Sequence, residues 1–161
     1  MDSWQPVWEV VVGALVLVLS MIVHGAGMYF VMVRAARHGT RGDEAQRFPE
    51  RQLFFGALIL AMLATHIAEL LLWAAVFTGI GAISGFRDAF YFSAVTYTTL
   101  GYEDVPLAIE WRLLAPLCAI TGVFAAGWTT GVMITILGRH FAPAGFPGAP
   151  PRGTPGGGHG H

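Results

Sequence analysis

Three apolar runs long enough to cross a lipid bilayer constrain this chain more than any other feature. The first run, residues 10–33, contains no Asp, Glu or Arg, and the third, residues 113–137, carries no charge. The second, from 53 to about 82, is interrupted by His66 and Glu69. A helix needs about 20 apolar residues to span a bilayer, and in lipid it must pair its own backbone groups. The sequence therefore predicts an all-α membrane protein with three transmembrane helices.

Composition excludes several other classes of protein. With 55% hydrophobic and 12% charged residues, the chain lies outside the soluble globular class. A net charge of −1 provides no basic surface for a nucleic acid. The single cysteine, Cys118, excludes an intrachain disulfide. We find no Ser/His/Asp or Cys/His set and no phosphate-binding loop, so we expect no enzymatic activity and no organic cofactor.

Arginine is the only long basic side chain in the sequence, and its distribution predicts an orientation. The segment 34–52 between the first two spans holds five of the nine arginines: Arg34, Arg37, Arg41, Arg47 and Arg51. The positive-inside rule places such a loop in the cytoplasm, which leaves the N-terminus outside and the C-terminus inside. The N-terminal segment 1–33 begins without a basic residue, so we expect a retained span and no cleaved signal. Residues 139–161, with five Pro and seven Gly, are predicted to be a disordered tail.

A short segment between the second and third spans has a different character. Residues 86–98 reach only about 20 Å as a helix, too short to cross a bilayer. Asp88 near its start suits the positive end of a helix dipole. The segment leads into the polar stretch TYTTLGYEDV, residues 96–105. A short helix followed by polar backbone predicts a re-entrant loop, which membrane proteins tolerate only where it is buried or lines an aqueous cavity.

The order of these features resembles the pore domain of potassium channels. The resemblance rests on YFSAVTYTT as a pore helix, on Thr99-Leu100-Gly101-Tyr102-Glu103-Asp104 as the filter, and on Gly122 and Gly127 in the third span. It covers about residues 86–137. The His-x-x-Glu of the second span and the WRLLAP opening of the third are similar to small bacterial potassium-channel-like proteins. The implied pore domain is 53–138, with the pore helix at 86–98, the filter at 99–104 and the inner helix at 112–138.

The resemblance implies a homotetramer with C4 symmetry in the bilayer of a bacterial inner membrane. Potassium would bind backbone carbonyl oxygens of the filter, at Thr99, Leu100, Gly101 and Tyr102. Gly101 would permit a backbone conformation that other residues resist. The inner helix would bend at Gly122 and line the pore through one face: Val123, Ala126, Thr130 and Ile134.

Two positions depart from the family pattern. Glu103 replaces the second filter glycine, where the family backbone adopts positive φ at a cost of about 1 kcal/mol to other residues. We therefore expect reduced selectivity for K⁺. Glu103 and Asp104 would form an outer mouth able to hold a divalent cation. Phe92 stands where much of the family has a tryptophan that tethers this aspartate, although Tyr91 beside it can donate a hydrogen bond.

Three ionisable residues, His24, His66 and Glu69, lie within the first two spans. Ionisable groups at membrane depth are costly and often functional. His66 and Glu69 are three residues apart and share a helix face. The network has three interpretations: hydrogen bonds that hold helices together, a pH-sensing or gating network, and a metal site.

The sequence thus predicts a tetrameric channel for monovalent cations, resembling potassium channels, with an altered filter. One alternative is a non-conducting membrane sensor or binding protein on the same fold. The other is a small membrane metalloprotein that uses His24, His66 and Glu69.

Overall fold

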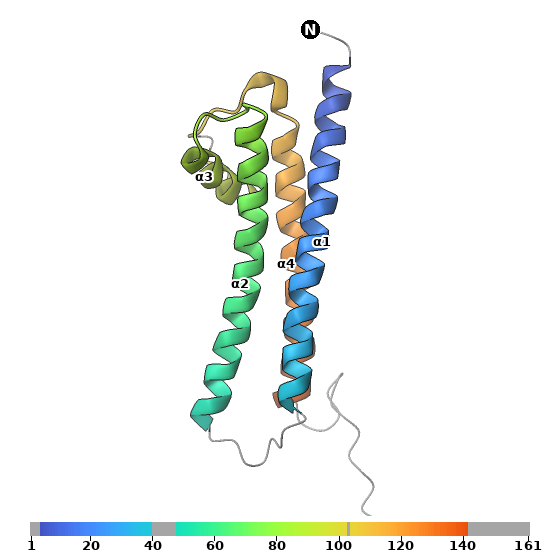
Figure 1. Ribbon diagram of the computed structural model, residues 1–161, viewed down its shortest axis with the longest axis vertical. Helices are drawn as coiled ribbons and strands as arrows, with labels where there is room; N and C mark the ends of the chain where they lie inside the picture. The colour runs from blue at the N-terminus through green and yellow to red at the C-terminus, as the bar shows by residue number, and fades with distance from the viewer. Residues whose placement is uncertain (1–3, 40–47, 103, 142–161) are drawn as a thin grey trace, which may run out of the picture.

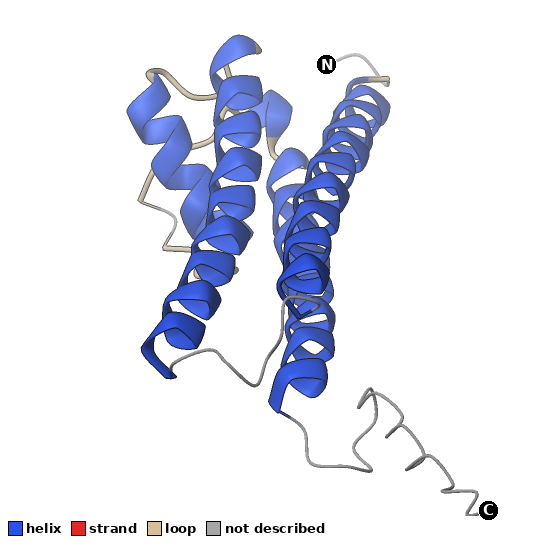
Figure 2. Cartoon of the chain, turned by 60° about the horizontal axis from the view of Figure 1, so that its bottom comes forward, coloured by secondary structure: helices blue, strands red, loops and turns tan. Residues whose placement is uncertain are grey.

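The computed structural model describes residues 4–39, 48–102 and 104–141, and those residues form helices and loops without strands (Figure 2). Three helices carry stretches long and apolar enough to cross a membrane, at Gln5–Arg37, Pro49–Gly79 and Leu114–Gly138. This confirms the three predicted spans. The elements follow in the order α1 (Gln5–Gly39), α2 (Phe48–Gly79), α3 (Phe86–Tyr97), the 3-10 helix η1 (Ile109–Trp111) and α4 (Leu114–Phe141).

The helices differ in length from the predicted segments. Helix α1 continues to Gly39 and α2 begins at Phe48, so Arg34, Arg37 and Arg51 lie in helices and not in the predicted loop 34–52. Arginine and alanine favour helix, and neither glycine nor proline occurs from residue 34 to residue 38. Helix α3 ends one residue before the prediction, α4 begins at Leu114, and α4 runs to Phe141 into the predicted tail. Arg41, Arg47 and residues 142–161 lie outside the described part of the chain.

The long helices form a bundle in which α1 and α4 run in the same direction and α2 runs against both (Figure 1). Helix α1 packs on both α2 and α4. The short α3 contacts α2 and α4 near the end of the bundle where α1 begins. Helix α3 is therefore held against α2 and α4 at that end, and the loop that follows it starts from this fixed position.

Two apolar clusters form the interior, and polar residues separate them along every long helix. The cluster nearer α3 contains Val16, Leu70, Trp73, Ala74, Phe77, Ala82, Ile83, Ala89, Tyr97, Leu114, Cys118 and Ala125. The other contains Met28, Val31, Ala35, Leu58, Met62, Val132 and Ile136. Between them in sequence lie the buried His24 of α1, the buried Glu69 of α2 and Thr129 of α4. The bundle thus places a polar layer between two tightly packed apolar layers.

Contacts at the α3 end fix the start of α4 and the position of α3. The Glu9 carboxylate on α1, 5% exposed, accepts a hydrogen bond from the Leu113 N–H at 2.8 Å. A carboxylate at a helix N-terminus satisfies a free donor and complements the helix dipole. On the other side, the rings of Phe77 on α2 and Phe92 on α3 meet edge to face, with centroids 5.2 Å apart.

Candidate functional site

The candidate filter loop, residues 99–104, begins as a turn folded back onto the end of α3. The Leu100 and Gly101 N–H groups donate to the Val95 carbonyl at 2.9 and 3.3 Å, and the Thr99 N–H donates to Thr96 at 2.9 Å. These bonds satisfy carbonyls that the helix end leaves free. Within the described part of the chain, no hydrogen bond engages the carbonyl oxygens from Thr99 to Tyr102. The first three N–H groups of the loop are thus bonded to α3, while its carbonyl oxygens remain without a partner among the described residues.

Two residues of this loop have left-handed backbone conformations. Gly101 has φ 62°, the conformation expected of it, which glycine adopts without a steric penalty. Thr99 has φ 59°, which costs a β-branched residue about 1–2 kcal/mol. Nothing in the sequence indicates this strain at Thr99. Glu103, where we expected strain, lies outside the described residues.

A hydrogen bond fastens the far end of the loop. Asp104 accepts from the Tyr91 hydroxyl of α3 at 2.8 Å. Tyr91 therefore supplies the tether that Phe92 cannot. The bond to the carboxylate raises the pKa of Tyr91 above its ordinary value near 10, because it favours the protonated phenol.

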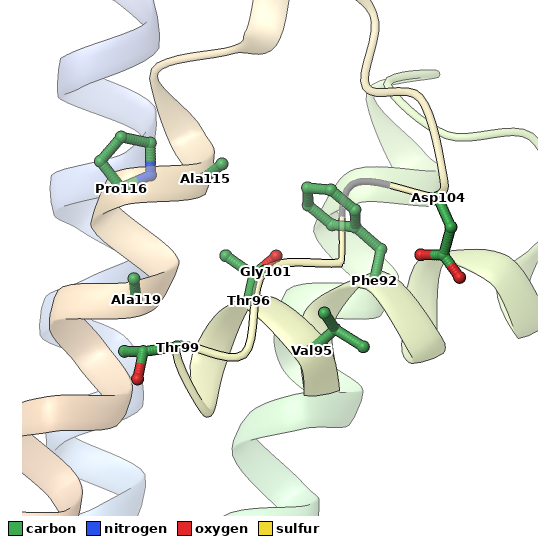
Figure 3. A pocket seen from close by; sticks show the side chains of 9 residues that line it. All are labelled: Phe92, Val95, Thr96, Thr99, Gly101, Asp104, Ala115, Pro116 and Ala119. Atoms are coloured by element: carbon green, nitrogen blue, oxygen red, sulfur yellow. The ribbon is translucent and has the colours of Figure 1, made fainter.

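A cavity of about 370 Å³ lies between α3, the loop and α4. Figure 3 shows Thr99 and Gly101 from the loop facing it, with Asp104 at one side and Ala115, Pro116 and Ala119 of α4 across from them. Small α4 side chains leave this space beside the loop open.

Gly122 lets the end of α3 approach α4 closely. A Cβ atom at this position would collide with the Tyr97 carbonyl oxygen. The resemblance to potassium channels implies a hinge at Gly122, which stays a prediction, and the structure shows that Gly122 permits this close approach. The predicted pore-lining residues follow on one exposed face of α4, at helical spacing: Val123, Ala126, Thr130 and Ile134. In the single chain, Val123 and Ile134 are 55% and 59% exposed.

The structure brings His24, His66 and Glu69 together in the polar layer. Both His24 and Glu69 are fully buried, and the His24 Nδ1 atom lies 3.4 Å from the carboxylate. The His66 Nδ1 atom lies 3.6 Å from it. One potential ligand atom from each residue lies within 4.8 Å of the others, so the three could hold a metal ion.

Two residues that the sequence did not single out complete the network. The Tyr97 hydroxyl donates to Glu69 Oε2 and lies 2.8 Å from His66 Nδ1. The Thr129 hydroxyl lies 3.1 Å from His66 Nε2 and 3.3 Å from His24 Nε2. We call these five residues the polar ring. Thr129 had one available signal, because it is a polar residue midway along an apolar span.

A second cavity, of about 460 Å³, connects the polar ring with the candidate filter loop. His66 and Tyr97 line it on the side of the ring, and Thr99 lines it on the side of the loop. Val123 and Ala126 from the proposed pore-lining face also border it. The ring, the loop and the exposed face of α4 therefore meet at one space.

The model of a family described as ion channel matches residues 53–139, which run from α2 through most of α4 and leave α1 outside. No curated protein and no solved structure matches the chain.

Proposed function

Because the chain belongs to the ion channel family, we propose that it is a tetrameric cation channel whose filter is the loop 99–104. The observation that carries this proposal is the direction of the loop's hydrogen bonds. The N–H groups of its first three residues, Thr99 to Gly101, bond to α3, while the carbonyl oxygens from Thr99 to Tyr102 have no partner in the described part of the chain. Unpaired carbonyls are the groups that replace the water shell of a permeating cation.

One chain supplies one strip of carbonyl oxygens, and a cation site needs a ring of them. A closed C4 assembly of this multi-pass membrane protein would complete the ring. The same assembly would turn the exposed face that begins at Val123 and ends at Ile134 toward a central pore. Tetramerisation thus accounts for both the free carbonyls and the exposed face.

The residues at the end of the loop support a preference for cations. Asp104, held by Tyr91, would stand with Glu103 around the outer mouth of each chain. Rings of carboxylates concentrate cations, and at this density they could also hold a divalent ion. We propose that Glu103, at a glycine position of the family pattern, lowers the selectivity for K⁺ over Na⁺.

The orientation proposed from the arginines agrees with their places in the fold. Arg34 and Arg37 near the end of α1, and Arg51 near the start of α2, lie at the bundle end opposite α3. With this end in the cytoplasm of a bacterial cell, the candidate filter would face the exterior.

Rb⁺ uptake by proteoliposomes tests the proposal, together with the mass of the purified complex. We expect a mass of about four chains of 17.3 kDa each, and Rb⁺ uptake well above that of empty liposomes. A tetramer that passes no Rb⁺, K⁺ or Na⁺ would instead favour the non-conducting sensor. A monomer would contradict the assembly itself.

A further inference from the structure

The five contacts of the polar ring need one more hydrogen than its side chains supply. Each of its five contacts needs one hydrogen, and with Glu69 ionised and both imidazoles neutral the ring holds four. Tyr97 gives its hydrogen to Glu69 and accepts from His66 Nδ1. Thr129 then donates to His66 Nε2 and accepts from His24 Nε2. In this arrangement the contact left without a hydrogen is the longest of the five, which joins His24 Nδ1 to Glu69 at 3.4 Å.

In this arrangement neither a hydrogen nor a positive charge lies between His24 Nδ1 and the Glu69 carboxylate. With the hydrogen of His24 on Nε2, the lone pair of Nδ1 faces the carboxylate, and both side chains are fully buried. The other carboxylate oxygen, Glu69 Oε1, is buried without a hydrogen-bond partner. Buried acceptors of this kind are rare and call for a donor or a cation.

The distance between His24 Nδ1 and the Glu69 oxygens indicates whether a proton or a metal ion fits between them. A proton shared between imidazole and carboxylate gives a separation of about 2.7–2.9 Å, whereas His24 Nδ1 lies 3.4 Å from both Glu69 oxygens. Ligands about 2.0–2.1 Å from a tetrahedral Zn²⁺ lie about 3.3–3.4 Å from one another. His66 Nδ1 lies 3.6 Å from Glu69 Oε2, and one potential ligand atom from each of the three residues lies within 4.8 Å of the others. We propose that His24, His66 and Glu69 form a buried site for a transition metal ion of the Zn²⁺ class.

The rest of the ring is arranged to support these ligands. When His66 carries its hydrogen on Nε2, both imidazoles donate to Thr129. His66 Nδ1 then gives up its hydrogen bond to the Tyr97 hydroxyl, and both Nδ1 atoms are free to bind a metal ion. The Thr129 hydroxyl then turns to Met28 Sδ, 3.9 Å away. Tyr97 continues to hold Glu69 Oε2, which leaves Oε1 as the ligand atom. Such partners fix the orientation of metal ligands.

A metal ion at this site would connect α1 to the candidate filter loop. Helix α1 lies outside the family match, and His24 is its contribution to the site. Tyr97, bonded to Glu69, is the last residue of α3 before the loop. His66 lines the cavity that reaches Thr99, which offers the metal ion a route into the site. The inference does not depend on which ion the channel conducts.

Metal binding to the purified, full-length protein tests the site without any measurement of ion flux. The background protein carries His159→Ser and His161→Ser, which removes the histidines of the terminal GHGH. After treatment with a chelator, we expect it to bind about one Zn²⁺ per chain, and Co²⁺ to give intense visible absorption from a low-coordinate site. Glu69→Gln and His24→Gln should each weaken binding at least tenfold. Ser20→Ala, which removes a buried hydroxyl of α1 outside the ring, should leave binding unchanged.

His24→Cys distinguishes a ligand from a structural residue. A thiolate in place of the imidazole should retain Co²⁺ and add a sulfur-to-cobalt charge-transfer band in the near ultraviolet. Folded background protein that binds neither Co²⁺ nor Zn²⁺ would overturn the proposal and assign the open contact to a proton. Binding that survives Glu69→Gln undiminished would overturn it too.

Discussion

The Tyr97 hydroxyl donates a hydrogen bond to the buried Glu69 carboxylate, which joins the last residue of α3 to the middle of α2. On the opposite side, the Tyr97 carbonyl lies against Gly122 of α4. Tyr97 is thus held between two membrane-spanning helices directly before the candidate filter loop. Substitutions that alter the contacts of Tyr97 with Glu69 or with Gly122 should therefore also alter the loop.

Replacement of Gly122 by alanine should displace Tyr97. The added methyl group would collide with the Tyr97 carbonyl, and overpacking of this kind costs about 1–3 kcal/mol. We expect a lower melting temperature in detergent and a large loss of Rb⁺ uptake. Gly131→Ala is the matched control, because a Cβ at that position on the same helix meets nothing within 4 Å. Equal melting temperatures and equal Rb⁺ uptake in the two variants would contradict the close contact between Gly122 and Tyr97.

Loss of the Glu9 carboxylate should loosen the start of α4. Glu9→Ala removes the acceptor of the Leu113 N–H, and lost helix caps cost about 0.5–2 kcal/mol. Glu9→Gln keeps a side-chain oxygen that can accept the same bond and should lose less. Hydrogen exchange at the α4 N-terminus measures the effect. Exchange that is the same in Glu9→Ala and wild type would show that the cap contributes nothing.

The Tyr91–Asp104 bond predicts a pH dependence at the outer mouth. Because Asp104 raises the pKa of Tyr91, the bond is fully present below pH 10 and is lost as the pH rises through that raised pKa. Asp104→Asn should shift the ionisation of Tyr91 back toward 10. Ultraviolet titration of tyrosinate should show this shift for one of the four tyrosines. In protein that already carries Tyr91→Phe, Asp104→Asn should cause no such shift. A shift that persists there would belong to another tyrosine.

Sequence pattern was sufficient for the parts of the fold that depend on the bilayer. The length and apolar character of the runs predicted the three spans, and membrane depth singled out His24, His66 and Glu69. Tyr97 and Thr129 escaped prediction because their partners lie on other helices, so their contacts depend on how those helices are rotated and packed. The positive φ of Thr99 escaped because no residue type marks it.

Replacement of Glu103 by glycine should raise the selectivity for K⁺ over Na⁺. Glycine restores the residue that the resemblance to potassium channels implies at this position, and it removes a carboxylate from each chain. Reversal potentials in mixed K⁺ and Na⁺ solutions measure the change. Glu110→Gln, which removes an exposed carboxylate of η1, provides the control. An unchanged reversal potential would show that Glu103 does not set selectivity.

Our proposal is that cations pass through a filter built from the loop 99–104. Its most direct test is the current across a planar bilayer that holds the protein under a K⁺ gradient. Gly101→Ala strains the loop because φ is 62° there, whereas Gly56→Ala on α2 meets nothing within 4 Å and is the control. We predict a cation-selective current in the wild type and in Gly56→Ala, and its loss in Gly101→Ala. An undiminished current in folded Gly101→Ala would contradict the claim.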